Sequence, residues 1–283
     1  MTITLLSTGL TLVATPIGNM LDISKRAMSA LAEADEVLCE DSRVSRKLLS
    51  RYGIKTKLRT YHEHNASKVR PKILEKLKSG AKIVLISDAG TPTISDPGYK
   101  LIRACIDSDI RVSTIPGPTA VIAALSISGL PTNKFYFGGF LPTKTNARKK
   151  ILNTCQQLDA TMVFYESPSR LAACLEDATV YFGERSAAVA RELTKLHEEV
   201  RRGTVAELSK FYSSSTPPKG EAVLLIGPPD SKAVWNESAV ERALSEALMS
   251  NTLRDAVQLV AAASGVSKSI IYDLALELNK PKS

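Results

Sequence analysis

Short apolar runs that end in loops rich in glycine and proline constrain the fold of this chain more than any other feature. The clearest run is Ile83-Val84-Leu85-Ile86, which is followed by the loop 87–98. A continuous β-branched run between turn residues is typical of a strand buried in a parallel sheet. Ligands of open α/β sheets bind beyond the carboxyl ends of such strands. We interpret 87–98 as a ligand loop, although a sharp surface turn would have a similar composition.

Two further loops repeat this arrangement. Residues 15–19 follow the apolar run 10–14, and residues 116–120 follow the run 112–115. Helical patterns alternate with these strands, which indicates an α/β fold with a parallel sheet covered by helices on both faces. The dinucleotide-binding glycine pattern and the P-loop lysine are both missing. The three loops together therefore predict a pocket for some other ligand of roughly adenosine size.

Polar clusters flank the apolar strands of a second block, which begins near residue 131. The strand 162–165 leads into Glu166, the strand 187–190 leads into residues 191–195, and the strand 222–226 follows Gly220-Glu221. Each cluster alone would be explained by a salt-bridged helix start. Their repetition favours a cleft lined by polar side chains.

The segment 43–82 carries most of the positive charge. It contains thirteen Lys or Arg residues and two acidic residues, a net charge of +11 in a chain whose total is +8. Concentrated positive charge is typical of a polyanion partner. Tyr52, Tyr61 and His62 lie in the same segment and could stack on bases. A solvated basic helix face is the alternative.

The C-terminal part has the pattern of a helix-turn-helix. Helical spacing over 252–263 and 268–278 is separated by a turn that contains Gly265. Residues 237–283 contain five basic and six acidic residues, so the basic face of a duplex reader is missing. Helix packing or a dimer contact explains this region equally well.

Composition and cysteine usage exclude several other classes of protein. No apolar run approaches the ~20 residues of a membrane helix. Residues 1–11 contain no Lys or Arg, so a secretory n-region is missing and we expect a cytoplasmic protein without a membrane partner. The four cysteines form no C-x-x-C pair, which predicts reduced core thiols. His62 and His64 in a polar stretch give little support for a metal site, and we expect none.

Six ordered blocks resemble the bacterial ribosomal RNA small subunit methyltransferase I family. The match extends over essentially the whole chain. It departs from the family pattern at Ser42, where Thr is commoner, and at Ser169, where His is commoner. The blocks are Thr15-Pro16-Ile17-Gly18-Asn19, Glu40-Asp41-Ser42-Arg43, Ser87-Asp88-Ala89-Gly90-Thr91-Pro92, Pro116-Gly117-Pro118-Thr119-Ala120, Phe164-Tyr165-Glu166-Ser167-Pro168 and Arg191-Glu192-Leu193-Thr194-Lys195.

This resemblance implies a two-domain tetrapyrrole methylase fold with S-adenosylmethionine in the cleft between the domains, and a homodimer. We expect domains at 1–117 and 118–229 and a helical region at 236–283. The implied reaction is methylation of the ribose 2′-hydroxyl of a cytidine in the decoding region, with 16S rRNA or the 30S subunit as partner. A precorrin-type tetrapyrrole methyltransferase and a non-catalytic rRNA-binding assembly protein are the alternatives.

The resemblance and the charge pattern also predict the site residues. The cofactor-binding set is Pro16, Asp88, Ala89, Gly90, Ile94, Ser95, Thr119, Ala120, Tyr165, Glu166 and Ala222. The substrate-binding set is Arg43, Arg46, Lys47, Arg51 and Arg170.

Methyl transfer to a hydroxyl gains from a base or from a cation that stabilises the developing alkoxide. Asp41, Glu192 and Lys195 are the expected catalytic residues, with Lys195 acting by its charge or as a base. Positioning of RNA phosphates and bridging of the domains are the alternative roles of these three residues.

Overall fold

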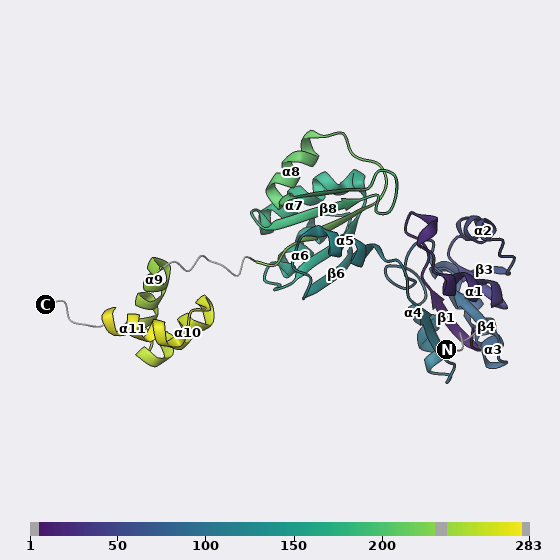
Figure 1. Ribbon diagram of the computed structural model, residues 1–283, viewed down its shortest axis with the longest axis horizontal. Coiled ribbons are helices and arrows are strands. Elements are labelled where there is room, and N and C mark those ends of the chain that lie inside the picture. The colour runs from purple at the N-terminus through teal and green to yellow at the C-terminus, as the bar shows by residue number, and fades with distance from the viewer. Residues whose placement is uncertain (1–5, 230–236, 279–283) are drawn as a thin grey trace. The chain divides into compact units, whose positions relative to one another are not determined.

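The computed structural model describes residues 6–229 and 237–278, which form two compact units with these bounds. The first unit contains two five-stranded sheets, and the second contains three helices (Figure 1). The expected segments extend into 1–5, 230–236 and 279–283, which lie outside the described residues.

The first sheet is entirely parallel, as the alternation of strands and helices predicts. Its strands lie in the order β3-β2-β4-β1-β5, and their carboxyl ends therefore share one edge. Burial of both faces explains the unbroken apolar runs in this part of the sequence. The strands are β1 (Gly9–Val13), β2 (Glu36–Cys39), β3 (Leu58–Thr60), β4 (Lys82–Leu85) and β5 (Val112–Ile115).

Helices cover both faces of this sheet (Figure 1). One face packs against α1 (Lys25–Glu33) and α2 (Ser42–Arg51), and the other packs against α3 (Glu63–Lys78) and α4 (Tyr99–Ile106). A short 3₁₀ helix, η1 (Met20–Asp22), follows the first loop. Ser24 caps α1, since its side chain accepts a hydrogen bond from the amide of Ala27.

The second sheet is mixed, so the parallel pattern is confirmed only for the first. Its order is β6-β7-β10-β8-β9, and β10 runs antiparallel to both β7 and β8. The start of β10 therefore lies at the edge where β7 and β8 end. A short connection between β8 and β9 permits their antiparallel pairing. The strands are β6 (Phe135–Phe140), β7 (Thr161–Glu166), β8 (Ser186–Arg191), β9 (Glu199–Thr204) and β10 (Ala222–Ile226).

Three helices pack on one face of the second sheet and one helix packs on the other. Buried residues of α6 (Thr145–Cys155), α7 (Leu171–Phe182) and α8 (Val205–Ser214) form a core with one face. The opposite face packs against α5 (Ala120–Ser128). A second 3₁₀ helix, η2 (Pro168–Arg170), precedes α7.

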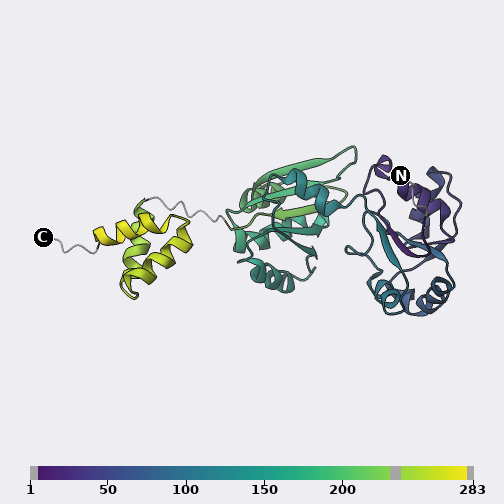
Figure 2. The same cartoon turned by 60° about the horizontal axis from the view of Figure 1, so that its bottom comes forward.

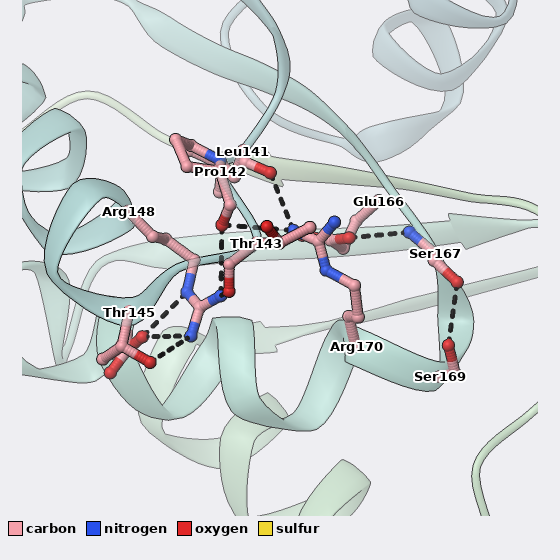
Figure 3. A network of polar contacts seen from close by, with 10 residues as sticks. Leu141, Pro142, Thr143, Thr145, Arg148, Glu166, Ser167, Ser169 and Arg170 are labelled. Atoms are coloured by element: carbon pink, nitrogen blue, oxygen red, sulfur yellow. Dashed lines mark hydrogen bonds and ion pairs between the residues drawn. The ribbon is translucent and has the colours of Figure 1, made fainter.

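Two arginines hold the segment that follows β6 (Figure 3). Nε of Arg148 donates to Oδ2 of Asp177 at 2.7 Å, and both side chains are buried. Nη1 of Arg148 donates to the carbonyls of Pro142 and Thr143 at 3.2 Å each, and Nη2 of Arg170 donates to the carbonyl of Leu141 at 2.7 Å. Three successive carbonyls are thus satisfied by guanidinium groups, which fixes the backbone of this segment.

The C-terminal unit contains α9 (Glu237–Leu248), α10 (Leu253–Ser264) and α11 (Lys268–Leu278), which pack around one small apolar core (Figure 2). Thr252 caps α10, and Gly265 ends it in a left-handed conformation with φ of 70°. The predicted helix-turn-helix pattern over 252–278 is therefore confirmed.

No helix in 6–229 or 237–278 is both long enough and apolar enough to cross a membrane. All four cysteines are buried as free thiols in β2, α4, α6 and α7.

The buried Arg148–Asp177 pair yields a stability prediction. Arg148→Met leaves the buried Asp177 carboxylate with the partly exposed Lys149, whose Nζ lies 3.4 Å from Oδ1, as its ion-pair partner, so we expect the free energy of unfolding to fall by about 3 kcal/mol. Urea unfolding followed by circular dichroism measures the change. The neighbouring exposed Lys150 provides the control, because Lys150→Met should stay within about 0.5 kcal/mol of wild type. Equal losses in the two variants would contradict a stabilising role for the buried pair.

Candidate functional site

A cavity of about 420 Å³ is lined by residues from both sheets. The first sheet contributes loops that follow the carboxyl ends of its strands, and the second contributes the ends of β7 and β8 and the start of β10. Of the eleven predicted cofactor residues, nine line it: Asp88, Ala89, Gly90, Ile94, Ser95, Ala120, Tyr165, Glu166 and Ala222. Pro16 and Thr119 do not line it, although their neighbours Ile17 and Ala120 do. The cavity is within the usual size range of small-molecule sites.

The three predicted loops come together at this cavity. Thr15 and Gly90 exchange backbone hydrogen bonds of 2.9 and 3.0 Å, which joins the first loop to the loop after β4. Oγ1 of Thr91 donates to the carbonyl of Pro118 at 3.0 Å, which adds the third loop. Gly90 and Gly98 have φ of 81° and 138°, as their turns require.

Backbone strain is concentrated in two loops beside the cavity. Among the described residues, five non-glycine residues have positive φ. Thr93 and Ser95 lie in the loop after β4, and Glu192 and Thr194 lie in the loop after β8, with φ between 49° and 72°. Such conformations cost free energy and cluster at functional sites.

Phe140, which the sequence did not point to, forms part of the cavity wall together with the predicted Tyr165. The ring centroid of Phe140 lies 5.4 Å from that of Tyr165, and the ring centroid of Phe137 lies 4.9 Å from it. The aromatic run 135–140 was visible in the sequence, but its pairing with β7 was not.

Glu192 and Lys195 are bonded to each other beside this cavity. Nζ of Lys195 donates to Oε1 of Glu192 and to Oε2 of Glu221, each at 2.9 Å, and the amide of Glu221 also donates to Oε1 of Glu192. The hydrogen bond from Lys195 lowers the pKa of Glu192. Burial favours the neutral amine of Lys195, but the bonds to both carboxylates outweigh it and raise the pKa of Lys195. Lys195 is therefore a cation at neutral pH.

The first loop approaches this lysine closely. A Cβ atom at Gly18 would lie 2.6 Å from Cγ of Lys195 and 2.7 Å from Oγ1 of Thr194. The amide of Asn19 donates to Oγ1 of Thr194 at 3.0 Å. The lysine is thus held against the loop that follows β1.

Asp41 is the N-cap of α2 and does not line the cavity. It accepts from the amide of Arg43 at 2.7 Å and from Nη2 of Arg43 at 2.6 Å, and these bonds lower its pKa to about 2. Its own amide donates to Oδ1 of Asp88 at 3.0 Å. Asp41 thereby links the start of α2 to the cofactor loop.

Asp96 lines the cavity and was not among the predicted site residues. Burial and the negative charge of Glu40 raise its pKa to about 6, Asp88 adds to the shift, and the Ser87 hydroxyl opposes it. Burial likewise raises the pKa of Glu40. Two sequence features could have assigned Asp96 to the site: its position inside the ligand loop 87–98, and the charged cluster at 40–43, which supplies Glu40.

Arg170, predicted to bind substrate, is engaged inside the protein (Figure 3). Its Nη2 lies 3.2 Å from Oε2 of Glu166 and also donates to the carbonyl of Leu141. The Glu166 side chain has an exposed fraction of 0%, and its Oε1 accepts from the amide of Ser167. Arg170 therefore holds a residue of the cavity wall in position.

Exposed cations remain on α2, whereas several others in the segment 43–82 are paired. Arg46, Lys47 and Arg51 are exposed. Arg59 and Lys76 each lie 2.9 Å from a carboxylate oxygen of the buried Glu36. The stacking hypothesis is wrong for Tyr61, whose exposed fraction is 1%. Tyr52 is half-buried, and its hydroxyl donates to the carbonyl of Met20.

The chemistry of the lining favours a ligand with a positive charge beside an apolar surface. Asp88, Asp96 and Glu221 are acidic lining residues of the cavity, and no Lys or Arg of the described chain is among the lining residues. Glu166 also lines it, but its carboxylate is bound to Arg170. Within 6–229 and 237–278, no group of three or more His, Cys, Asp or Glu side chains is arranged to hold a metal ion.

Sequence comparison finds two matching families and several close relatives. Residues 9–209 match the family Tetrapyrrole (Corrin/Porphyrin) Methylases, and residues 236–279 match the family RsmI C-terminal HTH domain. A protein of Mesorhizobium japonicum named Ribosomal RNA small subunit methyltransferase I is 47% identical over 96% of this chain and 93% of its own length. The protein of that name in Rickettsia prowazekii is 44% identical over 88% of this chain and 90% of its own.

Solved structures share the fold at low sequence identity. Diphthine synthase matches with a TM-score of 0.62 and 16% identity over 77% of this chain and 89% of its own. Uroporphyrin-III C-methyl transferase from Thermus thermophilus, complexed with S-adenyl homocysteine, matches with a TM-score of 0.54 and 16% identity over 77% of this chain and 97% of its own.

The raised pKa of Asp96 yields a prediction for stability. A carboxyl whose folded-state pKa is about 6, above its ordinary value of 3.8, destabilises the fold as pH rises through that range. The side chain at this position in the variant Asp96→Asn is uncharged at every pH. The melting temperature of the variant minus that of wild type should therefore increase as pH rises from about 4 to about 7.5. Thermal unfolding at several pH values tests this, with the exposed Asp107→Asn as control. A gap between Asp96→Asn and wild type that is independent of pH would contradict it.

Proposed function

The chain belongs to the tetrapyrrole methylase family and to its members named Ribosomal RNA small subunit methyltransferase I, and we propose that it methylates the ribose 2′-hydroxyl of a cytidine in the decoding region of 16S rRNA. S-adenosylmethionine-dependent methylation of small-subunit rRNA follows from this membership. The nucleoside, the atom that receives the methyl group and the region of the rRNA are our proposal.

One observation carries the proposal: the carboxylate-lined cavity lies next to the start of a helix with exposed cations. The amide of Asp41, the N-cap of α2, is bonded to Asp88 of the cavity wall at 3.0 Å. Arg46, Lys47 and Arg51 follow on that helix and are exposed. RNA phosphates bound along α2 would bring a nucleotide towards the cavity.

The residues of the cavity fit S-adenosylmethionine. Its sulfonium and ammonium groups are cationic and suit the carboxylate of Asp88. Its adenine suits the apolar surface that Tyr165, Phe140 and Ile17 provide. The cofactor supplies a methyl group on a positively charged sulfur. The nine lining residues predicted from the sequence are accordingly proposed as cofactor contacts.

The protein's own residues would accelerate the transfer mainly by alignment. Holding the hydroxyl oxygen in line with the methyl carbon accounts for about 7–11 kcal/mol in well-oriented systems. Lys195, a cation beside the cavity, is proposed to stabilise negative charge that develops on that oxygen. Glu192 fixes the lysine, and Asp41 fixes the start of α2. Both are proposed as positioning residues.

We further propose a cytoplasmic homodimer. The edge strand β6 supports an interface, since Phe135 and Tyr136 have exposed fractions of 44% and 42% at a sheet edge. Cytoplasmic localisation is proposed from the rRNA substrate.

The proposed division into domains between residues 117 and 118 is supported by the change of sheet between β5 and β6.

A methylation assay tests the reaction. With 30S subunits that lack the modification and methyl-labelled cofactor, we expect label in 16S rRNA at a position resistant to alkaline cleavage, because a 2′-O-methyl group blocks the attacking hydroxyl. Asp88→Ala should lose cofactor binding in calorimetry and lose transfer while it remains folded. Asp107→Ala, changed at an exposed position, is the control. Label in alkali-labile positions, or transfer to a uroporphyrinogen-like acceptor alone, would refute the proposal.

The role of α2 is tested by the salt dependence of rRNA affinity. Replacing Arg46, Lys47 and Arg51 by Glu should weaken binding and reduce the log–log salt slope by about 2, because each phosphate contact contributes about 0.7–0.9. The control replaces Lys55, Lys57 and Lys78, exposed residues that precede β3 or end α3 and do not lie on α2. It carries the same charge change and should keep the slope. Equal slopes in both triple variants would show that α2 is merely solvated.

A further inference from the structure

The three residues expected to act as acid or base are held in states unsuited to removing a proton. Asp41 is bound to Arg43 through both its carboxylate oxygens and does not line the cavity. Oε1 of Glu192 already accepts from Lys195 and from the amide of Glu221. Lys195 donates to two carboxylates and is charged. The acceptor for the hydroxyl proton has to be another group.

Asp96 differs from these three in position and in bonding. It lies in the cavity wall, and no salt bridge in the described chain involves its carboxylate. The loop that carries it is held in unfavourable backbone conformations, with φ of 72° at Thr93 and 66° at Ser95. Pro97 and Gly98 follow directly and lead into α4. The loop thus fixes one carboxylate at the cavity.

Resting on the proposed methylation of a ribose hydroxyl, we propose that Asp96 is the proton acceptor of the reaction. Its carboxylate takes the hydroxyl proton as the hydroxyl oxygen forms a bond to the methyl carbon. The carbon–sulfur bond breaks, and its electron pair stays on sulfur. The products are the methyl ether, the neutral thioether and protonated Asp96, which returns its proton to water.

The surroundings of Asp96 suit this role. The charged and titratable groups that face it are Glu40 at the end of β2, Asp88 on its own loop and Tyr165 on β7, while Ser87 contributes a hydroxyl. The charge of His62 lowers the pKa of Glu40, whereas the charges of Asp88 and Asp41 raise it. A pKa of about 6 leaves the carboxylate ionised at neutral pH and is close to the value that favours general base catalysis.

Kinetics of Asp96→Asn test the proposal on the full chain with 30S subunits. We expect kcat to fall by about 10²–10⁴ while the Kd of S-adenosylmethionine stays within a few-fold of wild type. In wild type, kcat/KM should rise with pH through about 6, and the variant should lack this rise. Thermal unfolding verifies that Asp96→Asn is folded.

A second variant changes the proton affinity without removing the carboxylate. Glu40→Gln deletes a neighbouring negative charge, so the rise in kcat/KM should move to lower pH and remain present. This result does not depend on the folding of Asp96→Asn.

Three results would overturn the assignment of Asp96 as proton acceptor. Turnover of Asp96→Asn within tenfold of wild type, with the same pH profile, would exclude it. An unchanged pH profile in Glu40→Gln would exclude it as well. Weakened binding of S-adenosylmethionine with unchanged binding of S-adenosylhomocysteine would assign Asp96 to recognition of the sulfonium charge instead. Absence of ribose methylation by wild type is a separate outcome, which would refute the proposed function itself.

Discussion

The pairing of Ala222 with Glu166 on one side and with Arg191 on the other is the constraint on which the site depends. Because β10 is antiparallel to both neighbours, the loop that enters it meets the loops that leave β7 and β8. Glu166, Glu221 and the segment 192–195 therefore gather at one edge. A register shift of one residue would turn every side chain of a strand to the opposite face. The apolar packing of both faces against α5 and α7 excludes such a shift.

Local sequence patterns predicted the parts of the fold whose side chains are buried on both faces. The run 83–86 extends one residue beyond β4, and the strand 222–226 has the bounds of β10. The strands β3 and β9 were not predicted. They lie at sheet edges, and Leu58–Thr60 offers one apolar residue while Glu199–Thr204 contains Glu and two Arg residues. Partly exposed edge strands lack the pattern on which such predictions rest.

The loops of the site could be predicted, but the ionisation states of its side chains could not. Sequence gives the number of charges in the segment 43–82, whereas the structure shows that Arg59 and Lys76 are paired with Glu36. In the same way, Asp41 and Asp96 both follow strands of one sheet, yet a bound arginine lowers one pKa and burial raises the other. These differences arise from tertiary neighbours, which spacing along the chain does not encode.

The close approach of Gly18 to Thr194 and Lys195 joins two loops that lie far apart in the sequence, one after β1 and one after β8. A side chain at position 18 would require the backbone at 193–195 to move, and with it the lysine bonded to Glu192 and Glu221. The two loops cannot vary independently during evolution. Drift in a loop of the first half is limited by the placement of a cation in the second, so the two halves have to be inherited as one functional unit.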